Sequence, residues 1–167
     1  MRQIIFFNPE YFSRNCARII VKQRQFMKLS TKGRYAVMAL ADLAKFDNRG
    51  PVSLRDISLR QGISLLYLEQ IFSKLKKNNI VKSTRGINGG YILTANPEQI
   101  KLSNIFSAVQ EVVKTVQCKK ESKKGCNGKA TKCITHDLWD ELEIHIQHFF
   151  NQKNLGDLIK GNNENRI

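Results

Sequence analysis

Several features are missing from this sequence, and each absence removes a class of protein. No run of apolar residues approaches the roughly 20 that a membrane-spanning helix needs, so we expect a soluble chain with no membrane partner. The apolar patch at Ile4–Phe7 is shorter than the core of a secretory signal, and no small-residue cleavage site follows it. No nucleophile–base pair or acid–base pair stands out, which argues against an enzyme.

Acidic residues are also scarce. The 167 residues include 28 Lys and Arg against 14 Asp and Glu, which gives a formal net charge of +14. Such a charge favours a polyanionic partner, nucleic acid first and an anionic membrane surface second. A basic surface that only keeps the protein soluble is the alternative, because net charge carries no information about the fold. The length allows one domain, or a small domain with an extension.

Cysteines are few, but they are clustered. A segment too rich in Gly and Lys for a core element holds Cys118, Cys126, Cys133 and His136. Thiolates and imidazoles are the ligands that soft and borderline metals select. Because Cys16 is remote, a framework of disulfides fits less well than a reducing cytoplasm with metal-binding or redox-active thiols. The same segment carries lysines that favour the thiolate form: Lys119, Lys120, Lys123, Lys124, Lys129 and Lys132.

Residues 1–26 show no helical or strand period and include a single acidic residue, Glu10. The segment has the composition of an Arg-containing targeting peptide, or of sequence upstream of the true start of translation. We favour Met27 as the functional start, because organised sequence follows it at once. Residues 1–26 are therefore expected to be poorly ordered.

A helix beginning at Thr31 is followed by two short helices with a tight turn between them. Ser53, with Asp56 three residues later, is typical of a helix N-terminus. Gly62 supplies the turn, and Ser64 is expected to cap the next helix. Two short helices joined in this way are the outline of a helix-turn-helix.

The second helix of the pair has two distinct faces. An apolar stripe at helical spacing is expected to be buried: Leu68, Ile71, Phe72 and Leu75. The opposite face and its edges carry Leu66, Glu69, Gln70, Ser73, Lys74 and Lys77. Gln can pair with adenine, Glu with cytosine, and an apolar side chain with the thymine methyl group. An ordinary solvated face is the alternative, but the position of the helix in the pair favours one that contacts DNA.

A β-hairpin is predicted at about residues 80–94. Two strand-like runs flank the Gly-rich segment 86–90, as in a hairpin with its turn. A hairpin directly after a helix-turn-helix is a wing. Its glycines let the backbone approach a phosphate, and Arg85 at its base is placed for a minor groove. Taken alone, the glycine cluster is equally compatible with a plain turn.

Residues 97–160 are expected to contain a helix at about 103–113, the cysteine loop at 118–136 and an amphipathic helix at 136–150. One side of the last helix is apolar: Leu138, Trp139, Leu142, Ile146, Phe149 and Phe150. Such a stripe is too apolar to stay exposed in a small domain. A second copy of the chain is expected to cover it, because dimers match palindromic DNA sites. Residues 161–167 are expected to fray.

Motifs known from one protein family occur in order along the chain. They begin at Met27 (MKLSTKGRYAV), Gly62 (GISLLYLEQIF), Arg85 (RGINGGY) and Cys133 (CITHDLW). With these motifs the chain resembles the bacterial iron–sulfur cluster regulators, from a winged-helix family that also includes nitric-oxide and cysteine-metabolism sensors. The resemblance covers about residues 27–160.

The resemblance implies a mainly α fold with a small β-hairpin wing. The winged helix-turn-helix would occupy 27–96, with the helix-turn-helix at about 54–77. It further implies a cytoplasmic homodimer on double-stranded operator DNA, repressing genes of iron–sulfur cluster assembly, with cluster donor or assembly proteins as further partners. Glu69 would discriminate between operator classes. The residues implied in DNA contact are Lys32, Arg34, Ser64, Leu66, Tyr67, Glu69, Gln70, Lys74, Arg85, Gly86 and Asn88.

By the same resemblance, a [2Fe–2S] cluster is bound by Cys118, Cys126, Cys133 and His136. Both gaps between cysteines are longer than is usual in the family, by about one or two residues, which a loop tolerates. Leu66 and Ile87–Asn88 also depart from the family pattern, so the operator sequence does not transfer. Structural zinc, or a thiol-based redox or nitric-oxide switch, suits the same ligands and stays open. A small electron-transfer protein would leave the helix-turn-helix without a purpose.

Overall fold

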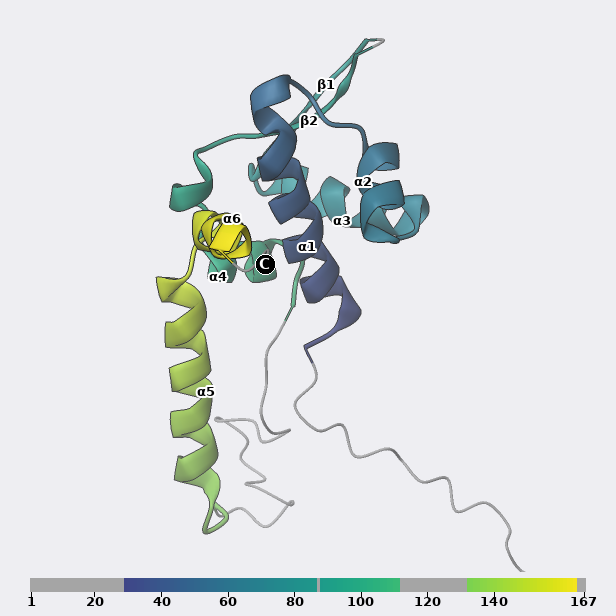
Figure 1. Cartoon of the computed structure of the whole chain (residues 1–167). Coiled ribbons are helices and arrows are strands. Elements are labelled where there is room, and N and C mark those ends of the chain that lie inside the picture. The colour runs from purple at the N-terminus through teal and green to yellow at the C-terminus, as the bar shows by residue number, and fades with distance from the viewer. Residues whose placement is uncertain (1–28, 87, 112–131, 165–167) are drawn as a thin grey trace, which may run out of the picture.

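The computed structural model describes residues 29–86, 88–111 and 132–164. In chain order the elements are α1 (Thr31–Phe46), the 3₁₀ turn η2 (Asp47–Arg49), α2 (Leu54–Gln61), α3 (Leu65–Lys77), β1 (Val81–Thr84), β2 (Gly90–Leu93), the 3₁₀ turn η3 (Pro97–Gln99), α4 (Leu102–Ala108), α5 (His136–Gln152) and α6 (Leu155–Glu164). In Figure 1, α1 runs through the centre of the body and α5 extends away from it. The predicted mainly helical fold with a small hairpin is confirmed. The predicted extension at 1–26 lies outside the described residues.

The helix-turn-helix consists of α2 and α3, as the sequence predicts. Ser53 Oγ accepts a hydrogen bond from the Asp56 backbone N–H at 3.1 Å, which caps the start of α2. Gly62 ends α2 in the left-handed conformation, with φ 63° and ψ 30°, and its N–H donates to the Ser58 carbonyl. Ile63, directly after the turn, is buried and anchors it to the core.

The predicted apolar stripe of α3 forms the centre of the core. Its members Leu68, Ile71, Phe72 and Leu75 are all buried. They face α1, whose buried positions include two small residues, Ala36 and Ala39, so that the helices pack closely. Burying each large side chain contributes about 1.5–3 kcal/mol, so this stripe fixes the orientation of α3.

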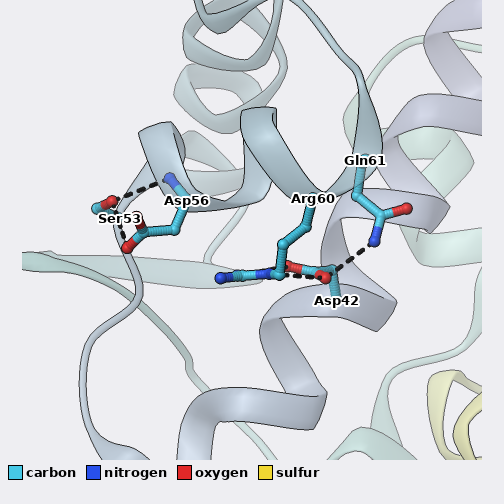
Figure 2. A network of polar contacts seen from close by, with 5 residues as sticks. All are labelled: Asp42, Ser53, Asp56, Arg60 and Gln61. Carbon is cyan, nitrogen blue, oxygen red and sulfur yellow. Dashed lines mark hydrogen bonds and ion pairs between the residues drawn. The ribbon is translucent and has the colours of Figure 1, made fainter.

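A buried carboxylate joins α1 to the end of α2 (Figure 2). Asp42 accepts from Arg60 Nη2 at 2.7 Å and from Gln61 Nε2 at 2.9 Å. The Arg60 guanidinium also lies over the Phe46 ring, 4.3 Å from its centre. The hydrogen bond to Asp42 raises the pKa of Arg60 above its ordinary value, against the smaller opposing effect of burial. Because Arg60 and Gln61 are the last residues of α2, this network fixes the helix-turn-helix on α1.

The wing is a two-stranded antiparallel hairpin fastened to the body. Its register pairs Val81 with Leu93, and Tyr91 forms an isolated bridge with Val52. A Cβ atom at Gly90 would lie 2.5 Å from the Val52 carbonyl oxygen, so this approach requires glycine. β1 follows α3 in the chain after a short turn, and β2 is bridged to Val52, so both strands of the wing are attached to the body.

α4 ends at Ala108, earlier than the predicted end near residue 113. Gln110 takes the left-handed conformation, with φ 58°, and stops the helix. The N–H of Glu111 donates to the Phe106 carbonyl at 2.8 Å, and that of Gln110 to Ser107 at 3.0 Å, which is a Schellman motif. The sequence did not reveal this stop, because Gln is uncommon at such a position.

A helix that the sequence did not separate, α6, follows α5 after a break at Lys153. Asn154 and Asp157 bond each other's backbone N–H groups, at 3.0 and 2.9 Å, and so start α6. Leu155 is fully buried, which docks α6 on the body beside α1 and η3. α6 continues to Glu164, further than the sequence analysis expected regular structure, and the rest of the predicted frayed tail lies outside the described residues. None of the described helices is both long and apolar enough to cross a bilayer.

Candidate DNA-binding face and metal centre

The outer face of α3 carries residues that the sequence predicts to contact DNA. Those in solvent are Ser64, Leu66, Glu69 and Gln70. Tyr67 is half-buried, because its ring packs edge-on against Tyr35 with the ring centres 5.9 Å apart. α3 thus exposes an apolar group, a carboxylate and an amide while its opposite side is sealed in the core.

The basic residues Lys32 and Lys74, from α1 and α3, meet at the end of α4. Lys32 Nζ donates to the Gln110 carbonyl at 3.1 Å, and Lys74 Nζ donates to Gln110 Oε1 at 3.2 Å. Both lysines are half-buried, and neither of these contacts is with a carboxylate. Arg34 is exposed, with its guanidinium 5.9 Å from the centre of the Tyr35 ring. This arrangement holds the lysines in place without neutralising them.

The predicted wing contacts also lie in solvent. Arg85, Gly86 and Asn88 are all exposed. Gly86 has φ 123°, a conformation that side chains disfavour. A Cβ atom at Gly89 would lie 2.6 Å from the Thr84 carbonyl oxygen, so the turn is closed by backbone alone. The turn therefore places two glycines, Gly86 and Gly89, near the cationic Arg85.

Two further basic residues at the join of α3 and the wing were not predicted as contacts. Lys76 Nζ donates to Ser83 Oγ at 2.6 Å, which ties the last turn of α3 to β1. Lys82 lies on β1 and is exposed. The sequence signal that could have indicated them is the run of lysines at the end of the predicted helix. This signal is ambiguous, because cations in the last turn of a helix also stabilise the helix dipole.

Half of the predicted metal ligand set lies in the described residues. Cys133 is half-buried, and His136, the first residue of α5, is 5% exposed. The His136 N–H donates to the Cys133 carbonyl at 3.0 Å, which brings the two residues together in one turn. Cys118 and Cys126 lie outside the described residues. Within the described ranges no group of at least 3 His, Cys, Asp or Glu is placed to hold a metal, so the full ligand set remains a prediction.

The surroundings of these two residues suit metal ligands. Cys133 Sγ lies 3.7 Å from Thr135 Oγ1, which also accepts a hydrogen bond from Trp139 Nε1 at 3.2 Å. His136 Nε2 lies 3.6 Å from Asp140 Oδ2. A hydroxyl beside the sulfur and a carboxylate beside the imidazole are common outer partners of metal ligands, where they orient the side chains. The donors present therefore fit either an iron–sulfur cluster or zinc.

Comparison with known proteins gives one consistent family. Residues 29–161 match the Rrf2 family, described as iron-dependent transcriptional regulators. The HTH-type transcriptional regulator IscR of Aliivibrio salmonicida (strain LFI1238) is 48% identical over 141 residues, covering 84% of this chain and 82% of that protein. IscR of Cronobacter sakazakii (strain ATCC BAA-894) is 49% identical over 133 residues, covering 80% of each.

Solved structures agree with this assignment. The structure of T. potens IscR matches with a TM-score of 0.67 and 34% identity, over 84% of this chain and 91% of that one. CymR (YrzC), the global cysteine regulator of B. subtilis, matches with a TM-score of 0.68 and 30% identity, over 81% of this chain and 98% of that one. These relatives are regulators of transcription and not enzymes, which confirms the predicted class. The chain therefore belongs to the Rrf2 family of iron-dependent transcriptional regulators, and it is a DNA-binding regulator with a winged-helix fold.

Proposed function

We propose that this regulator is a homodimer that represses genes of iron–sulfur cluster assembly according to the occupancy of a [2Fe–2S] cluster. The observation that carries the DNA-binding part is the division of α3 into a sealed inner face and an exposed outer face. The relatives named IscR support the link to iron–sulfur metabolism.

In the proposed complex α3 enters the major groove of operator DNA. Gln70 has the donor and acceptor to pair with adenine, Glu69 accepts from cytosine, and Leu66 meets a thymine methyl group. Lys32 and Lys74 contact phosphates, which fix the register without specifying sequence. Further contacts come from Arg34 and Ser64, from Tyr67, and from the wing residues Arg85, Gly86 and Asn88, with Arg85 in a narrow minor groove.

The cluster ligands in this proposal are Cys118, Cys126, Cys133 and His136. When bound, the cluster supplies a centre whose presence depends on iron supply and on oxidants. Asp140 would orient the His136 imidazole, and Thr135 would hydrogen-bond near the Cys133 sulfur, as outer partners of metal ligands do. Because clustered metal-binding thiols are typical of reducing compartments, we place the protein in the cytoplasm, where cluster assembly proteins would load it.

The proposed dimer interface is the apolar stripe of α5. Leu138, Trp139 and Phe149 are exposed along this helix. The helix itself extends away from the other elements (Figure 1). Two copies related by a two-fold axis would cover the same stripe on each other. They would also place two α3 helices for two half-sites of a palindromic operator.

The cluster is tested by purifying the protein without oxygen and measuring iron, acid-labile sulfide, zinc and the visible spectrum. We expect iron and sulfide in equal amounts, with charge-transfer bands that are lost when Cys118, Cys126 or Cys133 is changed to Ala. Cys16→Ala is the matched control and should retain the bands, because this cysteine lies far along the sequence from the others. A colourless protein that holds zinc, or no metal after reconstitution, would replace the cluster with the zinc or thiol-switch alternative.

DNA binding is tested by letting the wild-type chain select sequences from a pool of random duplexes. Enrichment of a palindromic sequence is expected, with an affinity that falls steeply as salt rises. Failure to enrich any duplex would rule out the proposed operator binding.

A further inference from the structure

The end of α4 contains an unusual residue for its backbone conformation. Gln110 takes the left-handed conformation at the point where a Schellman motif ends the helix, a position that glycine usually fills. Asn79 occupies the equivalent position after α3, with φ 55°, and the N–H of Ile80 donates to the Leu75 carbonyl at 3.0 Å. Asn adopts this conformation readily, whereas Gln gains nothing from it locally. A reason for Gln is therefore to be sought in what its side chain contacts.

Gln110 contacts both of the lysines that we propose to contact DNA phosphates. Its side-chain oxygen accepts from Lys74 of α3, and its carbonyl oxygen accepts from Lys32 of α1. Both acceptors are uncharged, so each lysine keeps its full positive charge and donors for a phosphate. A lysine side chain otherwise has many rotamers, and holding it near its bound position lowers the entropy lost on binding.

Glu111 fixes this junction against the start of α1. Its carboxylate accepts from the Ser30 backbone N–H at 2.9 Å and also contacts the Ser30 hydroxyl. Ser30 stands at the N-cap of α1 without capping it through its own side chain, so the Glu111 carboxylate supplies an acceptor at this helix end. A Cβ atom at Gly33 would lie 2.9 Å from Glu111 Cγ, so the close approach depends on that glycine.

We propose that Gln110 is a positioning residue for DNA binding, which holds Lys74 and Lys32 toward DNA phosphates and is itself fixed by Glu111. This inference rests on the proposed operator binding. The alternative is that residue 110 merely ends α4. Glycine would end the helix at least as well, but it could not reach Lys74, so the two roles are separable by substitution.

Gln110→Gly is the decisive variant, because it removes the side chain and suits the left-handed backbone. The probe is the duplex that the wild-type chain enriches, with affinity measured by fluorescence anisotropy over a range of salt concentrations. We expect about 3- to 10-fold weaker binding, the loss typical of one modest contact. Lys74→Ala, which removes the cation itself, should in addition make the slope of log affinity against log salt shallower by about 0.9, the value for one neutralised phosphate.

Asn79→Gly is the matched control, because it makes the same backbone change in the Schellman motif that ends α3. Its affinity and salt slope should equal those of the wild type. The thermal midpoint of Gln110→Gly should not fall, which separates a positioning role from a structural one.

A double-mutant cycle with Lys74→Ala completes the test. If Gln110 acts through Lys74, adding Gln110→Gly to Lys74→Ala should weaken binding no further. Additive losses, or a Gln110→Gly variant with the affinity of the wild type, would overturn the inference and leave operator binding intact. A wild-type chain that enriches no duplex would overturn operator binding and this inference together.

Discussion

α3 and α5 are both amphipathic helices, yet their apolar stripes meet opposite environments. In α3, Leu68, Phe72 and Leu75 are fully buried against α1 and the wing. In α5, Leu138 is 58% exposed and Phe149 is 53% exposed. α5 joins the body through its C-terminal end, where the ring centres of Phe150 and Phe106 are 4.6 Å apart. The rest of the helix extends outward (Figure 1).

The comparison shows what an amphipathic pattern determines and what it leaves open. The pattern fixes which side of a helix is apolar, but it does not state whether the same chain provides the covering surface. The apolar stripe of α3 is covered by other elements of the same chain, so this helix is part of the folding core. For α5 the stripe is available to a second copy, and its substitution should affect assembly more than folding.

The largest effect is expected from Leu138→Ser on the stripe of α5. In a symmetric dimer the change removes two buried side chains, each contributing about 1.5–3 kcal/mol, so dimerisation should weaken by about 3–6 kcal/mol. This corresponds to at least about a 100-fold rise in the dimer dissociation constant. Analytical ultracentrifugation across a dilution series measures it directly.

Ile144→Ser is the matched control for this prediction. Ile144 is 56% exposed, close to the value for Leu138, but it lies about 120° around the helix from it. Ile144→Ser should leave the dissociation constant near the wild-type value. Equal weakening by the two variants would place the interface elsewhere on α5, and no weakening by Leu138→Ser would remove α5 from the interface.

Phe72→Ala in α3 should instead destabilise the fold. The side chain is fully buried and packs edge-on against Tyr91 of the wing, with ring centres 4.9 Å apart. Loss of this packing should lower the free energy of unfolding by about 3–5 kcal/mol, measured by urea denaturation. A change below about 1 kcal/mol would mean that the core relaxes to fill the cavity. It would contradict the conclusion that the apolar stripe of α3, unlike that of α5, is part of the folding core.

The sequence predicted those features that depend on local pattern. The stripe of α3, the Ser53 cap, the Gly62 turn and the Gly-rich hairpin were all found from spacing and residue type. The α4 end was misplaced, because Gln110 has no local signal for a helix stop. The sequence could not predict which residues contact one another across elements. The contacts of Lys32 and Lys74 with Gln110 are an example.

Asp42 illustrates the same limit within the core. From the sequence it is one polar residue in a helix, but in the fold it is the buried acceptor for Arg60 and Gln61.

For the candidate metal site, the sequence predicts four ligands, and the structure describes two of them. Cys133 and His136 lie together in one turn, whereas the predicted partners Cys118 and Cys126 lie outside the described residues.

Asp42→Asn should lower the free energy of unfolding by about 1–3 kcal/mol, because it removes the negative charge of the carboxylate that accepts hydrogen bonds from both Arg60 and Gln61. Arg60 is partly exposed and can be solvated, which keeps the loss below that of a fully buried pair. The matched variant is Asp137→Asn at the start of α5, where the carboxylate lies 3.5 Å from Lys132 and both side chains are exposed. It should change stability by less than about 0.5 kcal/mol. Equal losses in urea denaturation would contradict the distinction between the packed body and α5.

The smallest effect is expected at the N-caps of α2 and α3, two serines in similar positions. Ser53 Oγ accepts from the Asp56 N–H, whereas Ser64 makes no side-chain capping bond. Ser53→Ala should therefore lower the unfolding free energy by about 1 kcal/mol, and Ser64→Ala by less. If Ser64 contacts an operator phosphate, Ser64→Ala should weaken DNA binding while leaving the thermal midpoint nearly unchanged, and Ser53→Ala should lower the midpoint. Parallel melting curves and anisotropy titrations distinguish them, and a Ser64→Ala variant with unchanged affinity would remove this hydroxyl from the DNA-binding face.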